Sequence, residues 1–349
     1  MKDIILVTGA AGFIGYHLCQ KLIKNKLNVI GIDSLNSYYS VELKNKRINK
    51  LNKSNDQSSL WIFKKGGLED KSFLDNIFKE FKPKIIVNLA AQAGVRYSLE
   101  NPDAYIYSNI LGFNNLIENS RKNFVKNFIY ASSSSVYGGN TKLPFSEKDQ
   151  VNHPVSLYAA TKRSNELVAH SYSDIYGLPC TGLRLFTVYG PWGRPDMAPM
   201  IFSNAILSKK PITIFNNGEM WRDFTYIDDV VEIIYRLIKK PAEKDSIFNK
   251  NSPNPSTSWA PYQLFNVGNS NKINLMNFIN LLEKEFGVKA IKKFSNMQKG
   301  DVESTFSDSE AIKTWTGFQP KTPIDIGIKK FADWYKIYFK NMPSTSTCI

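Results

Sequence analysis

The chain has 349 residues, of which 42% are hydrophobic and 22% charged, the balance of a soluble globular protein that divides a full core between two lobes. Cys19, Cys180 and Cys348 are too few and too scattered for a disulfide framework or a zinc site, so we expect a reducing compartment and no metal. No apolar run approaches the roughly 18 residues of a membrane helix, so we expect a cytoplasmic protein without a membrane partner.

The net charge of +14 raises the question of a nucleic-acid partner. The basic residues are scattered, however, and aromatic residues do not interleave with them as in a stacking platform. An example of this scatter is Lys44, Lys46, Arg47, Lys50 and Lys53. We interpret such residues as solvated helix faces and expect no nucleic-acid partner. A basic surface would instead steer a multiply anionic small molecule toward its site.

The first predicted elements form a dinucleotide-binding unit. Residues 4–8 are an apolar run typical of a buried strand, and the turn into the amphipathic helix that follows contains Gly9, Gly12 and Gly15. These glycines permit a tight turn, a close approach to a pyrophosphate at the helix N-terminus and close packing of helix on strand. The next strand ends in Asp33, where a carboxylate receives the ribose hydroxyls of NAD and repels the 2′-phosphate of NADP.

Apolar runs alternate with helical stretches up to about residue 185. The predicted strands are residues 4–8, 28–32, 60–64, 84–89, 126–131 and 180–186. This alternation predicts an α/β fold with a Rossmann-type doubly wound parallel sheet and helices on both of its faces.

Farther along the chain the pattern becomes less regular and richer in proline and glycine, which indicates a smaller C-terminal substrate lobe. We assign to the Rossmann domain residues 1–188 and about 223–250, because 228–238 is a predicted helix that returns to it. We assign to the smaller substrate lobe residues 189–222 and about 251–340. Within this lobe, residues 250–261 are a predicted surface loop, and 341–349 a disordered tail.

A tyrosine and a lysine four residues apart, Tyr158 and Lys162, share one face of a predicted helix. Free tyrosine has a pKa near about 10, and a cation one turn away favours the phenolate, so the pair is expected to act in acid and base catalysis. This spacing is also common on exposed helices. The catalytic interpretation of the pair is favoured here because the predicted strand 126–131 runs into the serines at 132–135, at the strand end where such folds bind ligands. A serine hydroxyl there can donate a hydrogen bond to a reacting oxygen.

These motifs together resemble the extended short-chain dehydrogenase/reductase family over nearly the whole chain, and within it most closely the UDP-glucuronate 4-epimerases. The segments that carry the closer resemblance are residues 33–39, 90–98, 186–197 and 222–229. The resemblance implies an NAD-dependent isomerase that converts UDP-glucuronate to UDP-galacturonate through a transient 4-keto sugar. It also implies a homodimer that pairs through the helices of 100–120 and 158–175.

The resemblance further implies roles for individual residues. The catalytic residues would be Tyr158, Lys162 and Ser133. The cofactor would contact Gly9, Gly12, Phe13, Ile14, Gly15, Asp33, Asn36, Leu68, Ala90, Ala91, Gln92, Asn109, Tyr158 and Lys162. The substrate would contact Arg96, Ser133, Ser134, Ser135, Tyr158, Thr187, Arg194, Arg222 and Asp301. In this last set, Arg222 would grip the pyrophosphate with its bidentate fork and Asp301 would touch the uridine ribose.

The contacts to the substrate carboxylate matter because the 4-keto form of a uronic acid is a β-keto acid. It loses carbon dioxide when the C5–carboxylate bond lies parallel to the carbonyl π system, so an epimerase must hold that bond out of alignment. By resemblance, the residues around the carboxylate are Thr187, Arg194 and Ser134. Thr187 and Arg194 could equally be a strand-end hydroxyl and a surface cation, and Arg96 could equally belong to a structural ion pair.

Three departures from the family pattern bear on function. Gly67 stands where relatives often carry an Asp that meets the adenine, which predicts weaker NAD binding. Asn88 replaces a frequent His. Trp221 stands where a basic residue is usual before Arg222, and it is the position at which we expect an altered substrate preference.

Four alternatives stay open at the level of sequence. UDP-xylose synthases form the same ketone and let it decarboxylate, but usually carry a different sequence from Trp192 to Met197. Dehydratases usually place an acidic pair where Ser134 and Ser135 stand. An epimerase could act on a neutral UDP-sugar, and a nucleotide-binding protein could keep the fold without catalysis, although the intact Tyr158 argues against the last.

Overall fold

The computed structural model describes residues 3–55, 60–297 and 302–341. Its centre is a seven-stranded parallel sheet in the order β10-β6-β5-β4-β1-β2-β3. These strands are β1 (Ile4–Thr8), β2 (Asn28–Asp33), β3 (Trp61–Lys65), β4 (Ile85–Asn88), β5 (Asn127–Ser133), β6 (Cys180–Leu185) and β10 (Tyr262–Val267). The strand order reverses between β1 and β4, and a ligand crevice forms at such a reversal. The predicted Rossmann-type fold is confirmed.

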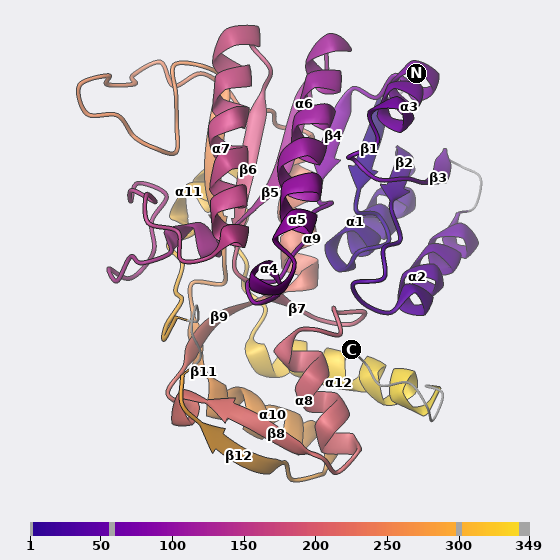
Figure 1. Ribbon diagram of the computed structural model, residues 1–349, viewed down its shortest axis with the longest axis vertical. Helices are drawn as coiled ribbons and strands as arrows, with labels where there is room; N and C mark the ends of the chain where they lie inside the picture. Colours follow the sequence, from indigo (N-terminus) through magenta and orange to yellow (C-terminus); the bar gives the residue numbers. More distant parts are fainter. Residues whose placement is uncertain (1–2, 56–59, 298–301, 342–349) are drawn as a thin grey trace.

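Helices cover both faces of the sheet (Figure 1). One face packs against α1 (Phe13–Lys24) and α9 (Ile227–Ile238), with α2 (Val41–Ser54) beside α1 and α11 (Glu310–Thr316) near β10. The other packs against α3 (Lys71–Phe81), α6 (Gly112–Lys122) and α7 (Leu157–Tyr176). Because successive strand residues point to opposite faces, Ile5 and Val7 of β1 join the first core and Leu6 the second.

Short helical turns fill the connections near the sheet's carboxyl edge. Between β4 and α6 these are α4 (Tyr97–Glu100), α5 (Pro102–Tyr105) and a π-helical turn, η1 (Ile106–Leu111). A 3-10 turn, η2 (Ser134–Tyr137), follows β5 directly. These turns therefore place the predicted serines and the wall after β4 beside the same edge.

The smaller lobe lies beyond the carboxyl edge of the sheet (Figure 1). Its three-stranded sheet contains β11 (Lys272–Asn274), β9 (Trp221–Tyr226) and β7 (Thr187–Tyr189). Its two-stranded sheet contains β12 (Ile291–Ser295) and β8 (Pro211–Phe215). Its helices are α8 (Ala198–Leu207), the 3-10 turn η3 (Asn216–Gly218), α10 (Leu275–Phe286) and α12 (Ile324–Lys340). Phe224 of β9 stacks on Phe278 of α10 with ring centroids 4.5 Å apart, which joins the sheet to its helices.

All six predicted strands are confirmed, with ends shifted by at most two residues, and the helix predicted at 228–238 is α9. The strands cross the assigned lobe boundaries, because the main sheet takes its seventh strand from the range assigned to the smaller lobe, while β7 and β9 belong in part to the range assigned to the Rossmann domain. This strand, β10, pairs in parallel with β6 from Tyr262 opposite Cys180 to Val267 opposite Leu185. Every residue of β10 is buried, as expected for a strand covered on both faces. The rest of the division into lobes stays a prediction, and the predicted tail at 342–349 lies outside the described residues.

Across the described ranges, the helices are all too short or too polar to span a bilayer. The same part of the chain contains no group of three His, Cys, Asp or Glu residues arranged to hold a metal ion.

Candidate active site

A cleft of about 860 Å³ opens at the carboxyl end of the parallel sheet and faces the smaller lobe. One wall comes from the glycine turn after β1, the loops after β2, β4 and β5, and the start of α7. The other comes from β7, α8, β8 and β9. The cleft therefore joins the position where α/β folds bind nucleotides to a lobe that can receive a second ligand.

The glycine turn brings the backbone close to this cleft. Gly9 has φ of +70°, and a Cβ atom there would lie 2.8 Å from the Ala90 nitrogen. A Cβ atom on Gly15 would lie 2.1 Å from the Gly9 carbonyl oxygen. Gly12 is the N-cap of α1 and carries no capping side chain, so nothing blocks the first helical turn, where Phe13 and Ile14 line the cleft. This turn fits a pyrophosphate bound at a helix N-terminus.

The carboxylate of Asp33 connects the end of β2 to the glycine turn. Its Oδ2 accepts a hydrogen bond from the Ala11 nitrogen at 3.1 Å, and its Oδ1 accepts one from the Leu35 nitrogen at 2.8 Å. Lys44 lies beside it and donates to the carbonyl and side-chain oxygens of Asn36, both at 2.7 Å. An acidic group held at this point suits the ribose hydroxyls of NAD and opposes an added phosphate.

The loop after β4 forms the next part of the cofactor wall. The Ala90 nitrogen donates to Thr8 Oγ1 at 3.1 Å, and Thr8 donates in turn to Asn88 Oδ1 at 2.6 Å, which gives Asn88 a structural role. Asn109 is not among the residues that line the cleft, and its cofactor contact stays a prediction. Its side-chain amide is fully buried and binds the Gln92 backbone at 2.8 Å and 3.0 Å. Asn109 therefore positions Gln92, which does line the cleft.

Tyr158 and Lys162 occupy the first turns of α7, at the edge of the cleft. Burial raises the pKa of Tyr158 above its ordinary value, although a hydrogen bond with Ser133 and the charge of Arg194 lower it. Burial also lowers the pKa of Lys162 to about 8. Among the chain's own groups, burial therefore raises the Tyr158 pKa, and its ionisation by Lys162 together with the charge of NAD stays a prediction. The Lys162 ammonium donates to the Ala131 carbonyl at 2.9 Å.

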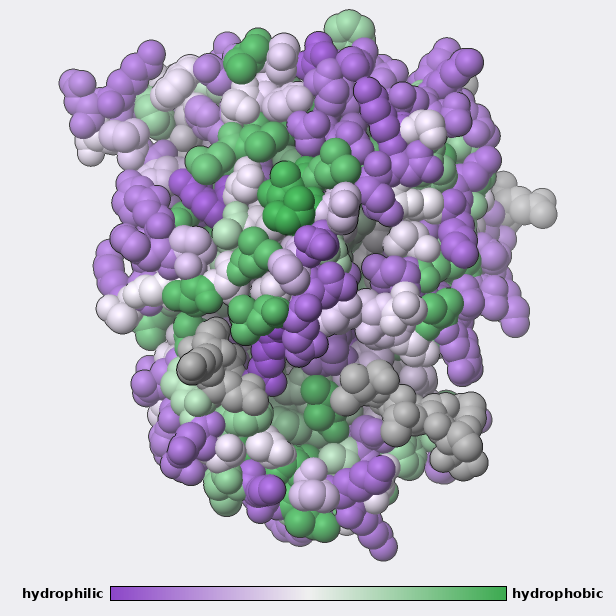
Figure 2. All heavy atoms as spheres, viewed as in Figure 1, coloured by the Kyte–Doolittle hydropathy of each residue, from purple (hydrophilic) through white to green (hydrophobic). Residues whose placement is uncertain are grey.

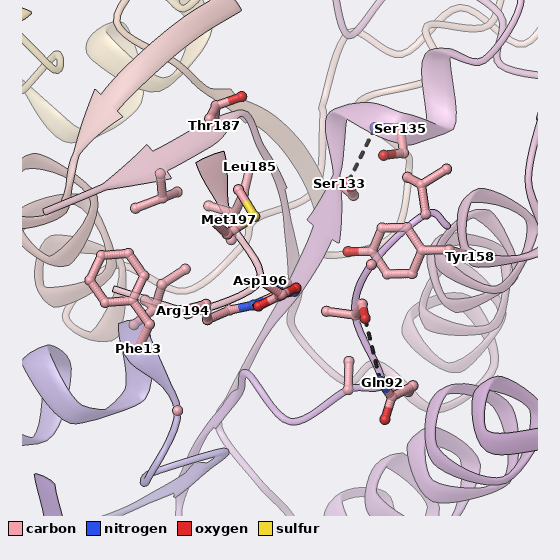
Figure 3. A pocket seen from close by; sticks show the side chains of 18 of the residues that line it. Phe13, Gln92, Ser133, Ser135, Tyr158, Leu185, Thr187, Arg194, Asp196 and Met197 are labelled. Atoms are coloured by element: carbon pink, nitrogen blue, oxygen red, sulfur yellow. Dashed lines mark hydrogen bonds and ion pairs between the residues drawn. The ribbon is translucent and has the colours of Figure 1, made fainter. Parts of the chain in front are cut away.

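Ser133 ends β5 beside Tyr158, with its hydroxyl accepting from the Ser135 nitrogen at 3.2 Å. Figure 3 shows the Tyr158 hydroxyl directed into the space between Ser133 and the side chains of Arg194 and Asp196. The serine and tyrosine hydroxyls thus face the same space, where both can reach one oxygen of a bound ligand.

A buried ion pair that sequence reasoning missed lies behind the serines. Glu166, one turn after Lys162 on α7, accepts from Ser132 Oγ at 2.6 Å and from both Nε and Nη2 of Arg184, at 2.9 Å and 3.0 Å. Glu166 and Arg184 have no exposed side-chain surface. Because it joins β5, β6 and α7 at the level of the serines, this network fixes the serine loop relative to Tyr158. The spacing of four from Lys162 is the signal that could have indicated it.

The predicted substrate residues come from both walls of the cleft. Thr187, which begins β7, and Arg222 line the far wall, and Ser134 and Ser135 of the loop after β5 line the first wall. Arg222 donates from Nη1 to the Trp221 carbonyl at 2.9 Å and to the Glu303 carbonyl at 3.1 Å. Arg96, on the opposite wall, has its guanidinium 5.2 Å from the ring centroid of Phe215 in β8. This contact joins the two sides of the cleft.

Arg194 lies deep in the cleft and binds the carboxylate of Asp196, to which Tyr38 also donates a hydrogen bond. Sequence reasoning missed both partners. The Arg-Pro-Asp order at 194–196 is the only local signal of the pair, and no local signal brings Tyr38 to a residue 158 positions away.

Three further sequence expectations concern Trp221, Gly67 and Asp301. Trp221 is not among the residues that line the cleft, whereas Met220 and Arg222 are, because neighbouring strand residues point to opposite sides. Gly67 lines the cleft, and the Glu69 carboxylate lies 2.1 Å from where a Cβ atom of Gly67 would be. A side chain at position 67 would therefore have to displace Glu69. Asp301, the predicted ribose contact, lies outside the described residues.

Residues 5–250 match the NAD dependent epimerase/dehydratase family, and the chain belongs to that family. Its cofactor is therefore NAD, which agrees with the glycine turn and with Asp33.

Individual proteins are similar to this chain over most of its length. Protein CapI of Staphylococcus aureus is 52% identical over 336 residues, which are 96% of this chain and 99% of that protein. UDP-glucuronate 4-epimerase 4 of Arabidopsis thaliana is 44% identical over 340 residues, 96% of this chain and 76% of that protein. Among solved structures, the UDP-glucuronic acid 4-epimerase of Bacillus cereus in complex with UDP-glucuronic acid and NAD has a TM-score of 0.82. It is 32% identical, and the match covers 96% of this chain and 99% of that one.

Proposed function

We propose that this protein is a UDP-glucuronate 4-epimerase, which interconverts UDP-glucuronate and UDP-galacturonate with NAD as a bound cofactor. The observation that carries the proposal is that one cleft joins a buried tyrosine and serine to an arginine on the facing wall. Tyr158 and Ser133 can act on a sugar hydroxyl, and Arg194 can meet a carboxylate on the same sugar. The names of the Arabidopsis relative and of the Bacillus structure support the same substrate.

The reaction follows from the placement of these groups. Tyr158 removes the proton of the C4 hydroxyl while Ser133 donates a hydrogen bond to the same oxygen. NAD, when bound, accepts the hydride from C4 and later returns it. After the 4-keto sugar has turned within the cleft, Tyr158 gives its proton back to the oxygen as hydride reaches the other face of C4, so the configuration inverts. Lys162, beside the tyrosine, would hold the nicotinamide ribose.

The remaining cleft residues would orient the nucleotide sugar. We assign the carboxylate to Thr187, Arg194 and Ser134, and the pyrophosphate to Arg222, whose fork suits two phosphate oxygens. The wall that carries Arg96 and Ser135 would contact the sugar from the other side. Asp301 stays a predicted uridine contact. A carboxylate held at Arg194 keeps the C5–carboxylate bond out of line with the C4 carbonyl, which favours the epimer over the decarboxylated product.

We also propose that the protein is a homodimer through the face formed by α4, η1 and α7. Large hydrophobic side chains are exposed on these elements: Leu99, Ile106, Tyr107, Leu111 and Leu167. Figure 2 shows hydrophobic side chains gathered on the side of the molecule where α6 and α7 lie. An apolar face of this kind, formed by adjacent helices, suits a second copy of the chain.

The decisive experiment is to incubate the purified protein with UDP-glucuronate and to analyse the product by chromatography and mass spectrometry. We expect a new isomer of unchanged mass. Loss of carbon dioxide as the main outcome would instead identify a UDP-xylose synthase. No turnover of UDP-glucuronate together with epimerisation of UDP-glucose would identify a neutral-sugar epimerase, and no turnover of either would favour a non-catalytic nucleotide-binding protein.

A further inference from the structure

Arg194 is held by a neighbouring carboxylate in a two-point contact. Its Nε donates to Asp196 Oδ1 at 3.0 Å, and its Nη2 donates to Asp196 Oδ2. The side chains of Arg194 and Asp196 keep only 22% and 25% of their surface exposed. Two parallel hydrogen bonds fix the plane of a guanidinium, and they leave the other N–H groups of Arg194 available to a ligand in the cleft.

The backbone around Arg194 is anchored separately. Arg47, fully buried on α2, donates from Nη2 to the carbonyls of Trp192 at 2.6 Å and Gly193 at 3.1 Å. Its Nη1 donates to the Ala11 carbonyl of the glycine turn at 2.8 Å. The loop that carries Arg194 is thus tied to the cofactor wall, and Asp196 makes the two-point contact with the arginine side chain itself.

Tyr38 completes the arrangement from the segment that follows β2. Its hydroxyl donates to Asp196 Oδ2 at 3.1 Å, and its ring packs on Tyr97 with centroids 4.7 Å apart. Gly94 makes room for it, since a Cβ atom there would lie 2.6 Å from the Tyr38 hydroxyl. The Tyr38 hydroxyl therefore occupies a space that only a glycine leaves open.

The surroundings of Asp196 and Tyr38 determine their ionisation at neutral pH. Burial raises the pKa of Asp196, but the Arg194 charge and hydrogen bonds lower it by more, so the carboxyl is ionised. Burial and the Asp196 charge raise the pKa of Tyr38 to about 12, so its phenol keeps the proton that it donates. Arg194 and Asp196 therefore form a charge-balanced pair, and the balance restrains how strongly the arginine attracts an added anion.

We propose that Asp196, held by Tyr38, is the positioning residue that fixes Arg194 and thereby determines the fate of the keto sugar. This inference rests on the proposed function. A fixed guanidinium holds the C5–carboxylate bond in one orientation, out of line with the carbonyl π system. With a loosened guanidinium the bond can turn into alignment. It then breaks, its electron pair moves through C5 to the carbonyl oxygen as an enolate, carbon dioxide leaves, and C5 takes up a proton.

The test compares products of the wild-type holoenzyme and of Asp196→Asn with UDP-glucuronate as substrate. Asparagine keeps the shape of the side chain but loses the charge that grips Arg194. We expect the ratio of decarboxylated product to epimer to rise about tenfold or more, while NAD content and melting temperature stay close to wild type. Tyr38→Phe removes only the supporting hydroxyl and should move the ratio in the same direction by a smaller factor. Tyr38→Phe also tests the proposal if Asp196→Asn does not fold.

Glu42→Gln is the matched control, because Glu42 is an exposed carboxylate paired with Lys46 on α2 and should leave the ratio unchanged. A wild-type product ratio in both Asp196→Asn and Tyr38→Phe would overturn the inference while leaving the proposed function intact.

If the wild-type enzyme does not convert UDP-glucuronate, the proposed function is wrong. The role of Asp196 is then tested by measuring binding. Loss of the Asp196 charge should shift the ratio of the Kd values for UDP-glucose and UDP-glucuronate about tenfold in favour of UDP-glucuronate. An unshifted ratio would show that Asp196 does not govern Arg194.

Discussion

Among the chain's own groups, burial raises the pKa of the Tyr158 phenol above its ordinary value. The two groups of the chain that work against burial are Ser133 and Arg194, one on each side of the space that the hydroxyl faces. To remove the proton of the C4 hydroxyl, Tyr158 must be the phenolate, so Arg194 and the positive charge of bound NAD would have to lower its pKa at the moment of reaction.

Tyr158→Phe keeps the ring and removes the proton carrier. We expect the turnover number with UDP-glucuronate to fall by about 10² to 10⁴, since this is the usual contribution of a positioned acid and base. NAD content, measured on the denatured protein, should stay near that of the wild type because the glycine turn and Asp33 are unchanged.

The control for this prediction is Tyr172→Phe, which removes a hydroxyl from the same helix, where it donates to Glu118 at 3.0 Å. It should retain turnover. A Tyr158→Phe variant as active as the control would contradict the proposed role.

At the scale of elements, one carboxylate organises the connection between α10 and β12. Glu283 keeps 2% of its side chain exposed and accepts from the Ala290 nitrogen at 2.9 Å, from Lys289 Nζ at 3.0 Å, and from Lys292 Nζ. Burial raises the pKa of Glu283, but these hydrogen bonds and charges lower it by more, to about 2. The ionised form therefore stabilises this part of the smaller lobe.

Glu283→Gln should lower the free energy of unfolding by about 1–3 kcal/mol at pH 7, because it removes the charge that accepts these hydrogen bonds at a buried position. Since the folded pKa is depressed, the wild-type advantage is fully present above the ordinary pKa of 4.5 and is lost as the pH falls toward 2. Urea titrations at several pH values measure both.

Glu310→Gln, which removes an exposed carboxylate from α11, should change the free energy of unfolding by less than about 1 kcal/mol. A difference between wild type and Glu283→Gln that does not shrink in acid would contradict this account.

For the whole molecule, the proposed dimer makes a direct prediction. Tyr107 of η1 and Leu167 of α7 expose 60% and 57% of their surface on the same apolar face. A Tyr107→Glu change would place an unpaired charge in the interface between two copies, so we expect a monomer in sedimentation velocity where the wild type is a dimer.

Ile337→Glu alters an equally exposed side chain, 66% accessible, on α12 of the smaller lobe. It should leave the dimer intact. A wild type that sediments as a monomer, or a Tyr107→Glu variant that stays dimeric, would rule out this face as the interface.

Much of the architecture could be predicted because its signals are local. The apolar run at 4–8, the glycines at 9, 12 and 15, and Asp33 follow one another within one unit, and the structure keeps them in that order around the cleft. The strand β10 escaped assignment to the main sheet because its pairing with β6 joins segments about 80 residues apart. No pattern within residues 262–267 indicates which strand they pair with.

Side-chain partnerships were the part of the site that could not be predicted. Asn109 was expected to touch the cofactor, yet packing turns its amide to Gln92 and Thr161. Lys162 was expected to lower the pKa of Tyr158, yet among the chain's own groups Ser133 and Arg194 lower this pKa and burial raises it. Both results depend on what surrounds a side chain in three dimensions.

The sequence alone determined the family, the cofactor and the identity of the candidate acid and base, because each depends on residue types at fixed local spacing. The tertiary structure decided which groups meet: Glu166 with Arg184 behind the serines, and Tyr38 with Asp196 beside Arg194. Hydrogen bonds and desolvation act over a few ångströms between residues that are far apart in the chain, so their outcome exists only once the fold has brought those residues together.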